Sequence, residues 1–510
     1  MMTVLSIIVF LIVLTVIVTI HELGHFYFAR KADILCHEFA IGMGPVIYQK
    51  RKGEIVYSVR AIPLGGYVAM AGEEMKDAYI KKNQNIGIRL DEDNLITHIV
   101  LNDDVEYDVL GKVIDYDLYG KDMSKLFISL ELADGSIVKY EVKRNAKYLF
   151  KNEKPMWITP EERSFESKTL WQRFKVIFAG PAANLILAFI LLFILAFFIG
   201  KPNNDPVIGS VSEGLGINSG DVVSNVNGIE VNSFSEISKI IHDSQNNKVV
   251  FTVDGNDVEL NLVIYMQGLG LTSKYGEDSL IVGQVFGRTK KLEAEDLITG
   301  ILISENEVSG INYVDVSNWN ELIKYVNDND GQYVYIRYER EENIFEDSYS
   351  GISHNALNKL DARPVEYSGG FSQDRKFNIL YPLYYPFVQM TDDISGMINT
   401  VGLLINPNEQ VGIRDLAGPV GIFSLVSSSL SQGFLSLLSF IAFLSINIAV
   451  LNLLPIPALD GGRLVFLGFE AITRKKVNKN VENILINITF ILLLVLIIFV
   501  TYNDILRLFS

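Results

Sequence analysis

The most apolar residues of this chain are grouped in four long stretches. Each stretch holds 20 or more residues without Asp, Glu, Lys or Arg, which is rare in the helices of soluble proteins. About 20 apolar residues suffice for a helix to cross the hydrocarbon core of a membrane. The first stretch lacks a positively charged start and a small-residue cleavage site, so we expect a retained span and not a signal peptide. The pattern predicts four transmembrane helices, at 1–30, 174–200, 434–462 and 483–503.

The segments between the first two spans alternate apolar and polar residues, as strands do. Residues 40–70 are rich in glycine and place Ile55, Tyr57 and Val59 at every second position. We interpret them as a membrane-associated β-hairpin, with a plain cytoplasmic hairpin as the alternative. Residues 73–165 contain further alternating runs of mixed charge and predict a cytoplasmic β-rich insert, in which we find no catalytic group of residues.

The long region between the second and third spans contains two similar patterns of strands, turns and one helix. The first, at 202–265, has the order of a PDZ-like domain. The second, at 282–343, is a degenerate copy, because Glu295 stands at the position that Gly220 holds in the first. Apolar residues at helical spacing then predict an amphipathic helix and linker at 381–433, packed on the PDZ-like units or on the membrane surface.

Charge is distributed as unevenly as hydropathy. The chain has 44 basic and 60 acidic residues, and this acidic balance excludes a nucleic-acid-binding protein, which needs a basic face. Its one cysteine, Cys36, excludes a disulfide framework and a CxxC metal motif. Residues 201–433 hold 15 basic and 32 acidic residues, whereas basic clusters follow the first and third spans and precede the second.

Because basic loops remain on the cytoplasmic side, we expect residues 30–175 and 460–482 in the cytoplasm. Both termini and the acidic region then lie outside. The predicted fold is a polytopic α-helical membrane protein with four transmembrane helices, extracytoplasmic PDZ-like α+β domains and a cytoplasmic β-rich insert.

The first chemical motif, HELGH at 21–25, lies near the end of the first span. Residues four apart share one face of a helix, so His21 and His25 can bind one metal ion through imidazole nitrogens, while Glu22 can reach a water molecule. At 1.5 Å per residue, His21 lies about 28 Å along the helix, before the basic residues that mark the interface. Ionisable groups at membrane depth are costly and are normally functional.

Two histidines leave a zinc ion under-ligated, so a third ligand is needed. Glu38 is the nearest carboxylate, but it falls in a polar segment outside the membrane. Asp460 is the better candidate, because Pro455 and Pro457 break the third helix where it would leave the membrane, and the following glycines allow a turn that points this carboxylate back into the bundle. The first and third spans run in the same direction, so the two motifs reach the same depth.

Six short motifs extend this pairing from the first span to the third and over the cytoplasmic approach to the site. They are HELGH at 21–25, AIGMGP at 40–45, PLGGYV at 63–68, GPAAN at 180–184, GPVGI at 418–422 and NLLPIPALDGG at 452–462. In these motifs the chain resembles the bacterial site-2-type intramembrane zinc metalloproteases, the regulator of sigma-E protease family within peptidase family M50.

The resemblance implies one zinc ion per chain, bound by His21, His25 and Asp460, with Glu22 as the catalytic carboxylate. The chemistry is coherent on its own terms, because zinc lowers the pKa of water and a carboxylate can then accept its proton. The implied activity is that of a zinc-dependent endopeptidase that hydrolyses peptide bonds within transmembrane segments.

The resemblance also implies that Asn184 and Asn452 position the substrate, although Asn184 is equally well interpreted as a polar contact between helices. The implied partners are membrane lipid, an upstream site-1-type protease, and single-span substrates that this protease has trimmed, such as anti-sigma factors or signal-peptide remnants. The PDZ-like domains would act as a size filter or, alternatively, as spacers. The implied location is the bacterial cytoplasmic membrane, with the active site near its cytoplasmic side.

Two other function classes remain open at this point. A membrane-tethered peptidase with an external active site would require the reversed topology. A PDZ scaffold or receptor with a vestigial site would bind no zinc.

Overall fold

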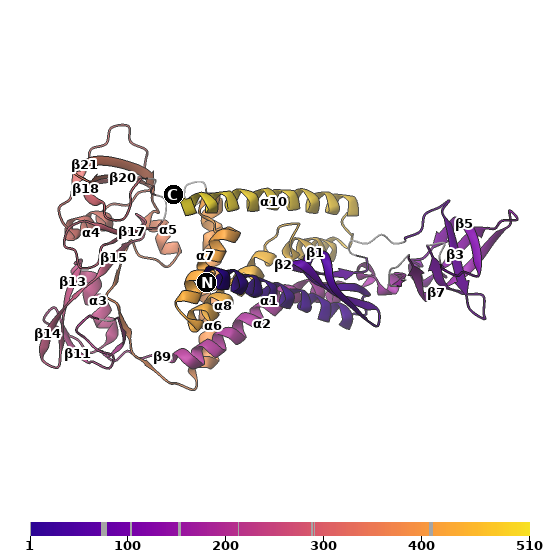
Figure 1. The fold of residues 1–510 in the computed structure, drawn as a ribbon, viewed down its shortest axis with the longest axis horizontal. Coiled ribbons are helices and arrows are strands. Elements are labelled where there is room, and N and C mark those ends of the chain that lie inside the picture. The colour runs from indigo at the N-terminus through magenta and orange to yellow at the C-terminus, as the bar shows by residue number, and fades with distance from the viewer. Residues whose placement is uncertain are drawn as a thin grey trace. The chain divides into compact units, whose positions relative to one another are not determined.

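In the part of the chain that the computed structural model describes, four helices are long and apolar enough to cross a membrane, which confirms the number predicted. The structure describes residues 2–72, 79–101, 105–150, 155–212, 214–286, 289, 291–406 and 412–509. The start of the predicted insert (73–78) and part of the predicted linker (407–411) lie outside these. The four helices are α1 (Met2–Lys31), α2 (Leu170–Ile199), α8 (Phe434–Leu453) and α10 (Lys479–Phe509), coloured along the chain in Figure 1.

The chain forms two compact parts. One part comprises 1–188 and 423–495, and the other comprises 189–422 and 496–510. The first part contains α1, most of α2, α8 and every predicted catalytic or metal-binding residue.

Helix α8 ends before the predicted boundary at 462. Two prolines follow its end, and a second helix, α9 (Asp460–Thr473), begins after a short turn. The glycines of this motif are helical and closely packed: a Cβ on Gly461 would lie 2.2 Å from the carbonyl oxygen of Leu454, and one on Gly462 would lie 2.3 Å from that of Ile456. Because they have no side chain, they leave space for the backbone of the turn that precedes α9.

Residues 36–70 form a long antiparallel hairpin beside α1 (Figure 1). Its strands are β1 (Cys36–Lys52) and β2 (Ile55–Met70). The hydroxyl of Thr15 on α1 lies 2.9 Å from the carbonyl oxygen of Pro63 on β2 and 2.7 Å from that of Leu11 in its own helix, so its one proton is shared between these two acceptors. A Cβ on Gly66 would lie 3.5 Å from Cγ of Glu22, so β2 runs directly past the HELGH motif.

The insert between β2 and α2 is a closed β-structure. Its strands occur in the order β4-β3-β5-β6-β7-β8, and a parallel pairing of β4 with β7 joins five of them into a ring. Buried isoleucine, leucine and valine side chains fill this ring. The strands are β3 (Asn85–Leu90), β4 (Ile96–Val100), β5 (Val109–Asp117), β6 (Phe127–Glu131), β7 (Ile137–Leu149) and β8 (Met156–Trp157).

Two units with the same order of elements follow α2. In each unit a four-stranded sheet packs on one helix, and the sheet orders β12-β11-β13-β14 and β19-β18-β20-β21 correspond strand by strand. The first unit contains β10 (Ile208–Val211), β11 (Val223–Val226), β12 (Ile229–Glu230), α3 (Phe234–Ser244), β13 (Lys248–Val253) and β14 (Asn256–Asn261). The second contains β17 (Val282–Val285), β18 (Leu297–Ser304), β19 (Val314–Asp315), α4 (Trp319–Asp328), β20 (Tyr333–Arg340) and β21 (Asn343–Ser350).

The backbone has the same shape at Glu295 in the second unit as at Gly220, the corresponding position of the first unit. Gly220 has a φ of 96° and Glu295 a φ of 76°, so both are left-handed. Their N–H groups donate to equivalent carbonyls, those of Ile208 at 2.8 Å and of Val282 at 2.9 Å. The second unit therefore carries strain that a glycine would avoid, although the turn keeps its shape.

The second unit is inserted into the first. Strand β17 pairs with the preceding β16 (Leu271–Ser273), but β10 pairs with β23 (Phe371–Gln373), which follows the second unit. Phe371 packs on the core of the first unit. The predicted boundary at 265 therefore leaves out a strand of the first unit, because pairing over more than 150 residues leaves no local signal in the sequence. The identification of these units as PDZ domains stays a prediction.

The remaining strands form short pairs. Strands β15 (Val263–Met266) and β22 (Val365–Ser368) pair with each other, as do β9 (Lys201–Pro202) and β24 (Arg375–Lys376). The remaining helices are α5 (His354–Lys359), α6 (Tyr381–Ile405), α7 (Pro419–Ser431) and the short 3-10 turns at Lys121–Met123, Glu161–Arg163, Phe165–Ser167 and Ile413–Asp415.

Candidate metal centre

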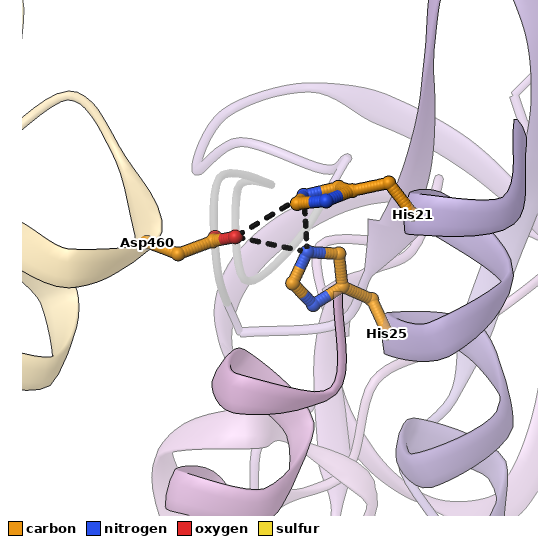
Figure 2. Close-up of side chains that lie close together, drawn as sticks. All are labelled: His21, His25 and Asp460. Carbon is orange, nitrogen blue, oxygen red and sulfur yellow. Dashed lines mark hydrogen bonds and ion pairs between the residues drawn. The ribbon is translucent and has the colours of Figure 1, made fainter. Parts of the chain in front are cut away.

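Three potential ligands meet between α1 and α9, as Figure 2 shows. The two imidazole Nε2 atoms of His21 and His25 lie 3.1 Å apart. Oδ2 of Asp460 lies 3.2 Å from the first and 3.3 Å from the second. Both histidines are buried, with 7% and 8% of their surface exposed. The structure thus brings together the three residues that the sequence had paired.

Local structure explains how each ligand reaches this point. His21 and His25 are four residues apart, so the continuous helix α1 places both rings on one face. Asp460 is the first residue of α9, where a carboxylate is stabilised by the positive end of the helix dipole. The helix break after α8 is therefore what allows Asp460 to face α1.

The chemistry of this cluster fits a metal ion. Its three ligand atoms lie within 4.8 Å of one another, and the described residues contain no other group of three His, Cys, Asp or Glu side chains placed in this way. Oδ2 of Asp460 is buried and accepts no hydrogen bond from the residues that the structure describes. Two imidazole nitrogens and one carboxylate oxygen are the donor set of a catalytic zinc site, which leaves a fourth position for substrate or water.

Helix α2 approaches this cluster unusually closely, and the reason is glycine. A Cβ on Gly180 would lie 2.2 Å from Nε2 of His25 and 2.8 Å from Nε2 of His21. A Cβ on Gly24 would lie 2.2 Å from the carbonyl oxygen of Ala179 on α2. Sequence reasoning identified the GPAAN motif but missed this role of Gly180, because the contact exists only between two helices more than 150 residues apart.

The backbone of α2 also fixes one ligand. Nδ1 of His25 lies 2.8 Å from the carbonyl oxygen of Val176. A carbonyl can only accept a hydrogen bond, so Nδ1 carries the proton and Nε2 keeps its lone pair for the metal. The sequence gives no sign of this contact, since a backbone carbonyl has no residue signature.

The two predicted asparagines lie in different surroundings. The side chain of Asn184 on α2 is fully buried, and its Nδ2 lies 3.4 Å from Nδ1 of His21. Asn452 on α8 is half-buried and donates to the carbonyl of Ile448 in its own helix, at 3.0 Å. Of the two, Asn184 is the one that the structure places next to a metal ligand.

Glu38, the carboxylate that the sequence analysis set aside as a ligand, belongs to the hairpin. It accepts hydrogen bonds from Arg60 and Tyr67, both at 2.8 Å, and from the hydroxyl of Ser58. Burial raises the pKa of the Glu38 carboxyl, but these three hydrogen bonds outweigh it and hold the pKa below its usual range. Glu38 therefore acts within the hairpin as a paired anion, which agrees with setting it aside.

Comparisons with known proteins agree with this geometry. The model of peptidase family M50 matches residues 9–496. The zinc metalloprotease RasP of Shouchella clausii is 30% identical, over 99% of this chain and 100% of its own length. A putative zinc metalloprotease of Staphylococcus aureus is 31% identical and the regulator of sigma-W protease RasP of Bacillus subtilis 27% identical, each over 99% of both chains. The family that the motifs indicated is confirmed: the chain belongs to peptidase family M50.

Proposed function

We propose that this protein is a zinc-dependent intramembrane endopeptidase that cuts the transmembrane segments of trimmed single-span proteins. The observation that carries this proposal is the buried cluster of His21, His25 and Asp460, two of whose members lie on a helix apolar and long enough to span a membrane. Membership of a peptidase family and the names of the zinc metalloprotease relatives support both the activity and the metal.

The residues of the chain divide the work of peptide hydrolysis. His21, His25 and Asp460 would hold the zinc ion, which when bound supplies a Lewis acid that polarises the peptide carbonyl and acidifies water. Glu22 follows His21 directly and is half-buried beside β2. Its carboxylate accepts the proton of the attacking water and returns it to the leaving nitrogen. The buried position of the histidines keeps bulk water away from the ligands.

The substrate must be unwound before its peptide bonds can be attacked. We infer that it lies extended along the hairpin of β1 and β2 and adds a strand to its edge. The support for this is that β2 passes Glu22 at Gly66 and is tied to α1 through Pro63. A strand added there would lie close to the catalytic carboxylate.

The proposed orientation follows the charge of the loops. Residues 30–175 and 460–482 would face the cytoplasm of a bacterial cell, and both termini and the acidic region 201–433 would lie outside the cytoplasmic membrane. The PDZ-like region would then admit only substrates that an upstream protease has shortened. One relative is named a regulator of sigma-W protease, and a membrane-bound anti-sigma factor is a substrate of the proposed class.

The substitution Glu22→Gln tests this function, because it removes the proton acceptor and preserves the shape of the side chain. We expect the purified variant to bind zinc at the wild-type ratio of one per chain but to lose cleavage of a trimmed single-span substrate. Unchanged cleavage would sink the mechanism. A wild-type protein without bound zinc after reconstitution would instead favour a scaffold with a vestigial site.

A further inference from the structure

We infer that Asn184 is a positioning residue of the metal centre: its side-chain oxygen accepts a hydrogen bond from Nδ1–H of His21 and so turns Nε2 of that ring toward the zinc ion. The inference rests on the proposed zinc site and goes beyond it, since Asn184 then acts through a ligand and not on the substrate. Three observations support it.

The first observation is the equivalence of the two histidines. Both rings direct Nε2 toward Asp460 and Nδ1 toward α2. For His25 the partner of Nδ1 is the carbonyl oxygen of Val176, which fixes the proton on Nδ1. When Nε2 of His21 binds a metal, the proton of that ring must also lie on Nδ1, and this N–H then needs an acceptor.

The second observation is an unsatisfied atom. Asn184 is fully buried, and its Oδ1 has no hydrogen-bond partner among the residues that the structure describes. Its Nδ2 instead faces Nδ1 of His21 at 3.4 Å. The two ends of an amide differ only in which atom is assigned as oxygen, so rotating the amide by half a turn places the acceptor opposite the N–H. The same rotation gives Oδ1 a donor and turns Nδ2 to the side where Oδ1 had no partner among the described residues.

The third observation is that the backbone at Asn184 is held in place. Its carbonyl oxygen accepts a hydrogen bond from the buried hydroxyl of Ser445 on α8, at 2.8 Å. Two helices thus determine where the Asn184 side chain begins, and the close approach of α1 and α2 at Gly180 determines how near it lies to His21. A side chain fixed in this way is suited to orient a ligand.

Two substitutions separate the possible roles of Asn184. Asn184→Asp keeps an oxygen acceptor and removes the amide donor, whereas Asn184→Leu keeps the shape and removes both. Zinc affinity of each purified protein is measured by competition with a chromophoric chelator, and the ligand field is read from the visible spectrum of the cobalt-substituted protein. Asn452→Leu is the matched control, because among the described residues its amide donates to the carbonyl oxygen of Ile448 in its own helix.

We expect Asn184→Leu to weaken zinc binding by about 10- to 100-fold, the usual effect of losing a partner of a metal-bound histidine. Asn184→Asp restores the affinity and the wild-type cobalt spectrum, and Asn452→Leu leaves both unchanged. If the leucine variant does not fold, Asn184→Ala takes its place in the comparison with Asn184→Asp.

The remaining outcomes overturn the inference and identify its replacement. Equal zinc affinity in all variants would mean that Asn184 does not orient the ligand. Loss of affinity in both Asn184→Asp and Asn184→Leu would mean that the amide donor, and not the oxygen, is required. Absence of zinc from the wild-type protein would contradict the proposed function itself. That result differs from the two outcomes for the Asn184 variants, because in those the wild-type protein still binds zinc.

Discussion

At the scale of single residues, the proposed metal centre depends on glycines, which have no side chain, as much as on its candidate ligands. Gly180 on α2 leaves the space into which both imidazole rings fit, and Gly24 on α1 leaves space for the carbonyl oxygen of Ala179. Such positions carry no chemistry of their own, but any added atom must displace a ligand or separate α1 from α2. Their effect should therefore appear in metal binding before it appears in the overall fold.

The substitution Gly180→Ala tests this directly. Its methyl group would lie 2.2 Å from Nε2 of His25, so we expect at least about a tenfold loss of zinc affinity, in the range seen when the surroundings of a ligand are disturbed. Gly396→Ala on α6 is the control, because nothing lies within 4 Å of its Cβ. Wild-type zinc affinity in Gly180→Ala would show that α2 can move away at no cost.

His37, at the start of the hairpin, predicts a dependence of stability on pH. Burial, with the nearby charges of Arg163 and Arg51, lowers the pKa of this imidazole to about 4, from an ordinary value near 6.5. Between these values the unfolded chain binds the proton and the folded chain does not. Neutral His37 therefore contributes fully to the free energy of unfolding above about pH 6.5. This contribution is lost as the pH falls toward 4, by up to about 1.4 kcal/mol per pH unit.

The measurement compares unfolding midpoints of wild-type protein and His37→Gln in detergent at pH 7.5, 6 and 5. We expect the wild-type midpoint to fall more steeply with decreasing pH, because glutamine does not titrate. Parallel curves for the two proteins would contradict the assignment to His37.

At the scale of elements, sequence reasoning succeeded where the information is local. The spans follow from runs of apolar residues, and the pairing of His21 with His25 follows from the helical repeat. Asp460 could be chosen because two prolines mark the end of α8. The start of a new helix at Asp460 and the contact of Asn184 with His21 could not be predicted, since they depend on packing between helices far apart in sequence.

The contact between α1 and the hairpin gives a prediction with an internal control. Thr15→Val removes the hydroxyl that donates to the carbonyl oxygens of Pro63 and Leu11. We expect it to destabilise the folded protein by about 1 kcal/mol, the usual net contribution of one hydrogen bond. Thr19→Val is the same chemical change one turn later, where the buried hydroxyl has no partner among the described residues. It should be neutral or stabilising.

Unfolding of the two variants by added SDS in mixed micelles measures this difference, with trypsin cleavage of the hairpin as a second readout. A Thr15→Val protein as stable as Thr19→Val would indicate that the hairpin does not need this hydrogen bond.

At the scale of the whole molecule, the region after α2 is bounded by two strands that pair with each other. Pro202 of β9 lies opposite Arg375 of β24, so the chain leaves and returns at neighbouring points. Residues 203–374 can therefore be replaced by a short Gly-Ser linker without a long gap to bridge. This makes the proposed size filter testable separately from the catalytic centre.

We expect the shortened protein to bind zinc and to cut both trimmed and untrimmed single-span substrates, whereas the full chain cuts only the trimmed form. Glu22→Gln introduced into the shortened protein controls for contaminating proteases. If the shortened protein still requires trimming, the selection of substrates lies elsewhere in the chain.

The insertion of the second β/α unit into the first has a consequence for biosynthesis. The first unit is started by β10, but the partner of this strand, β23, is made only after more than 150 further residues. During synthesis β10 therefore has an exposed edge, without β23, until the second unit has been made. Exposed strand edges favour wrong pairing. The inserted unit can fold before its host, so the host becomes the last part of this region to mature. Slowing translation just before β22 should therefore prolong the period in which nascent chains are most vulnerable to degradation.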